Sequence, residues 1–260
     1  LQRAQFGLRG RLTPTLNYVL LTEVGRNLTT AERPVMPLDA ALTYTGLPFA
    51  KLRAGLMKRP TGHEAVVGVP RDYPYVYFSS ATAALMQEAF YEDVAGTPVG
   101  CSVPAGSVSI DCARVVSGAN AFRDWGLLAH DSYTRGPWEW AWAAMSANGG
   151  PPENVRDDGR RDFIARLQGS YVFKGAGAKR EDAQLFVWRQ AGERRYGQTD
   201  IERVREGAGF QVKRGRWRVT GEALRGRGMI AAGRNPPVGL VDAALRPDYA
   251  LNLAPRGEAS

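Results

Sequence analysis

Residues 138–144 read WEWAWAA and residues 163–173 read FIARLQGSYVF, and in both stretches large apolar side chains recur at every second position. In the first stretch three tryptophans alternate with Glu139 and two alanines. In the second, aromatic and aliphatic residues alternate with Arg166, Gln168 and a serine. Because successive side chains of an extended chain point to opposite faces, both stretches predict β-strands with one apolar and one polar face.

The same period-two pattern recurs along most of the chain. It predicts ten strands, at residues 3–12, 16–24, 38–44, 50–56, 125–129, 138–144, 163–173, 184–190, 210–213 and 216–223. Short turns are expected at 13–15, 46–48, 134–137 and 214–215, with a moderate one at 174–183, and long polar links near 26–37, 59–122, 147–161, 191–203 and from 225 onward. Short and long connections therefore alternate. This is typical of an all-β, antiparallel up-and-down transmembrane β-barrel, whose turns are short on one side of the membrane and whose loops are long on the other.

Alternation alone does not say which face meets water. In a soluble sheet the apolar face packs on a core, whereas in a wide membrane barrel it faces lipid and the polar face lines a water-filled lumen. The apolar faces mix Trp, Tyr, Leu and Ala rather than bulky aliphatic residues, and Lys and Arg repeat on the opposite faces. We therefore favour the barrel, with Trp138, Trp140 and Trp142 as a lipid-facing band rather than a stacking platform for nucleobases.

The chain is basic, with 34 Lys and Arg against 26 Asp and Glu and a formal net charge of +8. Such a protein is expected to meet anions, whether nucleic acid, lipid phosphates or small solutes. It has no apolar run of about 18 residues, so we expect no transmembrane helix. The opening LQRAQFGLRGR has no signal-peptide core, which indicates either a cytosolic or an already processed chain. The abrupt start at Leu1 and the final PRGEAS predict a partial chain.

Two cysteines, Cys101 and Cys112, lie in the longest link. In an exported protein they are expected to form a disulfide, and in a cytosolic one two inert thiols. The two histidines, His63 and His130, are too few and too far apart in sequence to predict a metal site. No nucleophile elbow, P-loop, HExxH, dinucleotide fingerprint or haem-attachment motif occurs, so nothing favours an enzyme or a cofactor.

The segment PLDAALTYTGLPFAKLRAGLMKRPTGHE, residues 37–64, resembles the phosphate-selective porin family, which comprises outer-membrane porins O and P of Gram-negative bacteria. The elements that carry the resemblance are Asp39, Tyr44-Thr45-Gly46, Gly55, and Gly62 followed by Glu64. The opening hairpin and later stretches, including GFQVKRGRWRVTGEAL, look like further strands of that family, although the resemblance is sharpest in residues 1–64.

The resemblance implies a single β-barrel domain over residues 1–260, incomplete at both ends because the family has sixteen strands, and a homotrimer in the outer membrane. It also puts the 59–122 link in the place of the loop that narrows the family's pore. An arginine pair lines the constriction in that family. Here the corresponding residues are Gln2-Arg3, so only Arg3 carries over, together with Asp39 as the constriction aspartate. The missing arginine favours a broader anion preference than tight phosphate selectivity.

From these patterns we expect a lumen that passes small inorganic anions by passive diffusion, in contact with outer-membrane lipid and without nucleic acid. Arginine suits the path because its planar fork offers several donors to an anion and stays charged. The expected pore-lining residues are Arg3, Arg9, Arg11, Asp39, Lys51, Arg53, Arg166, Arg216, Arg218 and Glu222. The alternative for each of these residues is a solvated charge that does not contact the permeating anion.

Two other functions fit the same sequence. One is a β-barrel sleeve that holds a partner protein in an outer-membrane complex. The other is a soluble basic β protein that binds nucleic acid, which would dissolve without detergent and bind DNA with a steep salt dependence.

Overall fold

The computed structural model describes residues 4–24, 35–67, 122–149, 160–177, 180–196 and 199–228, with short pieces at 79, 82, 85–86, 88–90, 101–102, 111–112, 115–116, 231–232 and 250–251. Ten long strands and one two-residue strand form an 11-stranded sheet in the order β1-β2-β3-β4-β9-β10-β11-β12-β13-β14-β16. Neighbouring strands are antiparallel throughout. The long strands are β1 (Ala4–Thr13), β2 (Leu16–Val24), β3 (Val35–Tyr44), β4 (Lys51–Lys58), β9 (Arg123–Arg135), β10 (Trp138–Ala147), β11 (Asp162–Lys174), β12 (Glu181–Tyr196), β13 (Thr199–Arg214) and β14 (Trp217–Gly228).

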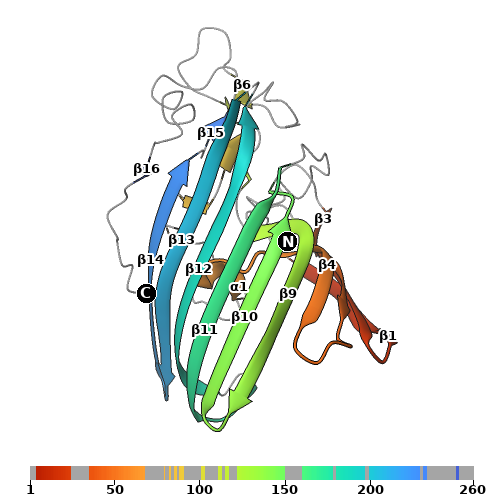
Figure 1. Ribbon diagram of the computed structural model, residues 1–260, viewed down its shortest axis with the longest axis vertical. Helices are drawn as coiled ribbons and strands as arrows, with labels where there is room; N and C mark the ends of the chain where they lie inside the picture. The colour runs from red at the N-terminus through yellow and green to blue at the C-terminus, as the bar shows by residue number, and fades with distance from the viewer. Residues whose placement is uncertain are drawn as a thin grey trace.

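Each long strand therefore pairs with the next long strand in the chain, which is the up-and-down arrangement predicted from the alternating pattern. Strands β9 to β14 run side by side along the long axis, β1 to β4 continue the sheet at one side, and the tight turns of β9 to β14 gather at the lower end (Figure 1). Within the described residues the sheet is open, with β1 at one edge and β14, paired to the short β16 (Ala250–Leu251), at the other.

All ten predicted strands are present, and two of the tight turns contain a glycine with positive φ. Gly136 has φ 59° and Gly215 has φ 58°, a backbone region that other residues rarely adopt. These glycines therefore fix the hairpins β9–β10 and β13–β14 where the sequence predicts short turns.

One predicted connection is wrong. The sequence indicated a long link at 191–203, but β12 continues to Tyr196 and β13 begins at Thr199. The ladder is unbroken through this region, with Glu193 opposite Glu202. The sequence of this region is polar at most positions, so the period-two signal disappears although the backbone pairing continues.

The remaining elements are short. Helix α1 (His63–Val66) lies behind the sheet (Figure 1). A small sheet joins β5 (Glu88–Phe90) to β8 (Val115–Val116) and to β15 (Ala231–Ala232), and β6 (Cys101–Ser102) pairs with β7 (Asp111–Cys112). No helix in the described part of the chain is long and apolar enough to cross a membrane.

The side chains of the sheet separate into two faces. The apolar face carries exposed aromatic and aliphatic residues, among them Trp138, Trp140, Trp142, Phe163, Leu167, Leu185, Phe210 and Trp217. The opposite face, called the polar face below, carries most of the buried charged and amide residues of β11 to β14, including Asp162, Arg166, Asp182, Gln190, Arg203, Arg205 and Gln211. The buried apolar clusters also lie here, one around Phe186 and Trp188 and one around Leu128 and Met145.

Candidate pore wall

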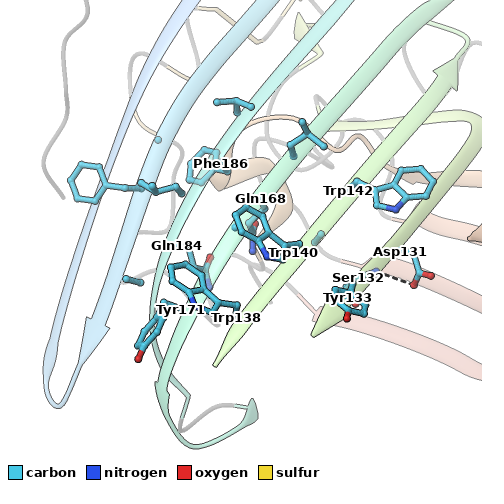
Figure 2. Close-up of a pocket in the computed structure, with 18 of the residues that line it drawn as sticks. Asp131, Ser132, Tyr133, Trp138, Trp140, Trp142, Gln168, Tyr171, Gln184 and Phe186 are labelled. Atoms are coloured by element: carbon cyan, nitrogen blue, oxygen red, sulfur yellow. Dashed lines mark hydrogen bonds between the residues drawn. The ribbon is translucent and has the colours of Figure 1, made fainter. Parts of the chain in front are cut away.

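The apolar face is continuous across β10 to β13, and its large side chains are exposed. Figure 2 shows Trp138, Trp140 and Trp142 spaced along β10, with Tyr171 beside Trp138. The rings of Trp138 and Trp140 stack at 6.2 Å, and Tyr171 meets Trp138 edge-on at 5.0 Å. These residues border a shallow hollow of about 1220 Å³ whose other walls include Leu185 and Phe210. A water-facing surface would not normally present so large an apolar patch.

Charged residues bound this apolar face at the end of the strands away from the tight turns. Arg189, Glu206 and Arg225 stand opposite one another across β12, β13 and β14. Arg225 and Glu206 form an exposed ion pair at 3.5 Å. One row further on, Arg227 pairs with Glu202 at 3.2 Å. The apolar face is therefore a band of limited height.

The polar face carries buried ion pairs. Arg203 Nη1 lies 3.1 Å from Asp162 Oδ2, and both side chains have no exposed surface. The pair spans from β11 to β13 across Gly192, where a Cβ atom would collide with Asp162 Oδ1. A charged pair of this kind is expensive to bury, and removing one partner leaves an uncompensated charge inside the protein.

A second group of charges lies at the tight-turn end. Arg180, just before β12, donates to Asp182 Oδ2 at 2.6 Å and to Glu139 Oε2 at 2.8 Å. Burial by itself lowers the pKa of Arg180, but these hydrogen bonds and the two nearby negative charges outweigh it and raise the pKa above its ordinary value. The guanidinium therefore stays charged and joins β10 to β12 at this end, through Glu139 and Asp182.

Part of the 59–122 link packs against the polar face. Residues 59–67, called the α1 segment below, contact β11, β12, β13 and β14. Arg166 Nη1 donates to the carbonyl of Thr61, and the His63 ring stacks on Phe186 at 5.6 Å. His63 Nε2 also lies 2.7 Å from Gln211 Nε2. Further along, the Leu85 carbonyl accepts from Arg205 Nε at 2.5 Å.

Four of the predicted pore-lining residues, Arg9, Arg11, Lys51 and Arg53, lie on the polar face at β1 and β4. Arg11, Asn17, Thr43 and Arg53 stand in one row across β1 to β4, and the row continues to Gln190 and Arg205. Arg9 is two residues before Arg11 and exposed, as Arg11 is. Arg53 Nε donates to Thr43 Oγ1 at 2.9 Å. No carboxylate in the described residues forms an ion pair with Arg9, Arg11 or Arg53.

Two predicted residues in this region are instead paired. Lys51 Nζ lies 2.5 Å from Asp131 Oδ1, and Asp39 Oδ1 accepts from Arg123 Nε at 3.1 Å. Lys51 and Asp39 are therefore engaged in ion pairs, whereas Arg9, Arg11 and Arg53 form no ion pair with a carboxylate of the described residues.

For Arg166 and Glu222 the structure places the side chain on the predicted face but under the α1 segment. Arg166 is 7% exposed, with its guanidinium carbon 4.2 Å from the centre of the Phe186 ring. Glu222 accepts hydrogen bonds from Trp188 and from the His63 backbone. Arg166 is therefore buried and Glu222 partly buried, because the α1 segment packs over this part of the polar face.

The three remaining predicted pore-lining residues lie in three different places. Arg218 stands opposite Lys213 on the polar face of β14. Arg216 lies in the turn between β13 and β14, stacked over Trp217 at 5.5 Å, so its predicted place in a strand is wrong. The glycine turn extends one residue further than the sequence pattern indicated. Arg3 lies outside the described residues.

Cys101 and Cys112 face each other in backbone register, one in β6 and the other in β7. Opposite residues of an antiparallel pair have Cα atoms about 4.5–5.5 Å apart, which is within the span of a disulfide. The predicted disulfide remains a prediction. We expect alkylation of the unfolded, unreduced protein to leave its mass unchanged and alkylation after reduction to add two groups. Alkylation without reduction would contradict the bridge.

No protein-family model matches this chain, and no curated protein matches it. Solved structures with some similarity are outer membrane proteins of Vibrio cholerae. In vitro folded OmpT in its trimer form is 12% identical, with 86% of this chain and 80% of that chain covered and a TM-score of 0.26. An OmpT mutant lacking loop L8 is 12% identical over 86% and 84% of the two chains, with a TM-score of 0.23. The roles of the two faces rest on the contacts of this chain's own residues.

The sequence missed the residues that seat the α1 segment: His63, Phe186, Trp188 and the glycines at 207 and 209. The sequence did carry two signs that a segment covers this part of the sheet. The segment 184–190 has large apolar residues on both faces, which a strand needs only when both faces are covered. The alternating glycines of EGAGF at 206–210 were a second sign, since they lie opposite these aromatics.

Proposed function

We propose that this chain forms the wall of an outer-membrane porin that passes small anions by passive diffusion. The observation that carries the proposal is the separation of the sheet into an uncovered apolar face and a charged face against which part of a long link packs. In a soluble protein the apolar face would be the covered one.

The height of the apolar band supports a membrane. On β11 the band runs from Phe163 to Phe173, ten residues further along the strand. At about 3.4 Å per residue this is about 34 Å of strand. A tilt of about 45° reduces it to about 24 Å, close to the ~25 Å apolar band of membrane barrels.

The preference for anions is supported by Arg9, Arg11 and Arg53. Arg9 and Arg11 are two residues apart on β1, which places them about 7 Å apart, so an anion can pass from one guanidinium to the other. The acids of the wall are largely engaged with other cations, as the pairs Asp162–Arg203 and Asp39–Arg123 illustrate. The resemblance of residues 37–64 to phosphate-selective porins and the overall charge of +8 point the same way.

The test is incorporation of the detergent-purified, full-length protein into planar lipid bilayers. We expect stepwise increases in conductance, each step marking one inserted pore. Absence of steps together with a partner protein that copurifies in the lumen would favour a sleeve. Solubility without detergent and salt-sensitive DNA binding would instead favour a soluble β protein that binds nucleic acid.

A further inference from the structure

The Glu222 carboxylate bridges the sheet and the α1 segment. Its Oε1 atom accepts a hydrogen bond from Trp188 Nε1 at 2.8 Å, and its Oε2 atom accepts one from the His63 backbone N–H at 2.9 Å. One oxygen is thus engaged by β12 and the other by the segment. A carboxylate with both oxygens occupied in this way is poorly placed to select permeating ions.

The surrounding residues leave room for this bridge. Trp188 is on β12 and Glu222 on β14, so the indole reaches across β13, where it lies opposite Gly207. A Cβ atom at Gly207 would lie 2.6 Å from Trp188 Nε1, and one at Gly62 would lie 3.0 Å from Glu222 Oε1. Larger residues at either position would displace the indole or the carboxylate.

Other contacts hold the link on both sides of this bridge. Arg166 reaches the Thr61 carbonyl, before His63. Arg205 donates to the Leu85 carbonyl and, through Nη1, to the carbonyls of Val204 at 2.7 Å and Arg227 at 2.6 Å. These are charge-assisted bonds to backbone atoms, so they fix the path of the chain rather than the identity of its side chains.

We propose that Glu222 is a positioning residue that latches the α1 segment to the β11–β14 wall and thereby sets the width of the pore, not its preference for anions. The role in pore width rests on the proposed function. The α1 segment covers the polar face of β11 to β14 and keeps anions away from it. The path for anions then lies along β1 and β4, where Arg9, Arg11 and Arg53 are.

The experiment compares the full-length protein with Glu222→Ala and with Trp188→Phe, which keeps the ring and removes one donor to the carboxylate. Hydrogen exchange followed by mass spectrometry reports on residues 59–67. Loss of a bond to a charged acceptor is expected to speed exchange of the His63 amide by about tenfold or more in Glu222→Ala and less in Trp188→Phe. The exchange of β10 and β11 should not change.

Bilayer recordings of the same variants give the second readout. Glu222→Ala is expected to raise the single-channel conductance and leave the reversal potential as in the wild type. The matched control is Glu206→Gln, which removes a carboxylate from the neighbouring strand on the apolar face, where Glu206 pairs with Arg225. It should change neither the exchange of residues 59–67 nor the conductance.

Wild-type exchange of residues 59–67 in Glu222→Ala would overturn the latch. A shifted reversal potential at unchanged conductance would overturn its role in pore width. The exchange readout needs no pore. Faster exchange in Glu222→Ala therefore supports the latch even if the wild-type protein gives no conductance, a result that overturns only the proposed function and the role in pore width.

Discussion

Replacing Asp162 with alanine is expected to lower the free energy of unfolding by about 3–5 kcal/mol, the usual cost of breaking a buried ion pair by removing one partner. Asp162 and Arg203 have no exposed surface, and the Asp162 carboxylate also accepts a hydrogen bond from Gln190. The substitution takes away the carboxylate that neutralises a guanidinium within the wall. The change is measured by denaturant unfolding of the protein refolded into lipid vesicles.

The double variant Asp162→Ala with Arg203→Met is the control. Because it removes both charges, we expect it to recover a large part of the stability lost in Asp162→Ala. Equal losses in the single and double variants would show that the packing around residue 162, and not the pair of charges, sets the stability.

Replacing Leu185 with arginine is expected to destabilise the protein by about 2–4 kcal/mol, the cost of a basic residue at the midplane of a membrane barrel. Leu185 is 70% exposed and lies in the middle of the apolar band, in one row with Trp140 and Phe210. In water an exposed leucine exchanged for arginine changes stability little. The substitution therefore distinguishes a lipid-facing from a water-facing surface.

The matched control is Gln184→Arg, one residue earlier on the opposite face of β12. Gln184 bonds to Asp182 at 2.6 Å, so an arginine there has an acid nearby and remains on the polar face. We expect little loss of stability. Similar small effects of both substitutions would mean that neither face contacts lipid.

The sequence predicted the strands because their faces differ in hydrophobicity. Trp138 to Trp142 and Phe163 to Phe173 show this most clearly, and the glycines at 136 and 215 mark turns between strands. Where the two faces do not differ in hydrophobicity, the sequence did not predict the strand. The β12–β13 hairpin beyond residue 191 is paired by its backbone, which leaves no mark on the side-chain pattern.

The surroundings of the predicted pore-lining residues were predicted only in part. Arg9, Arg11 and Arg53 occupy the expected face because a period of two determines it. The covering of Arg166 and Glu222 depends on His63 and Thr61, more than 100 residues away in the chain, and no local pattern reports such contacts. The signs that did exist, Phe186 and Trp188 facing Gly209 and Gly207, become interpretable once the strands are in register.

An anion-selective pore along the polar face of β1 to β4 would determine the reversal potential in a planar bilayer under a KCl gradient. The wild-type potential should lie near the chloride equilibrium value, and the double variant Arg11→Glu with Arg53→Glu should lose that preference. Arg135→Glu, on the same face as Trp138, is the control and should behave as the wild type. A wild-type preference for cations, or a potential unaffected by the double substitution, would show that these arginines do not line an anion path.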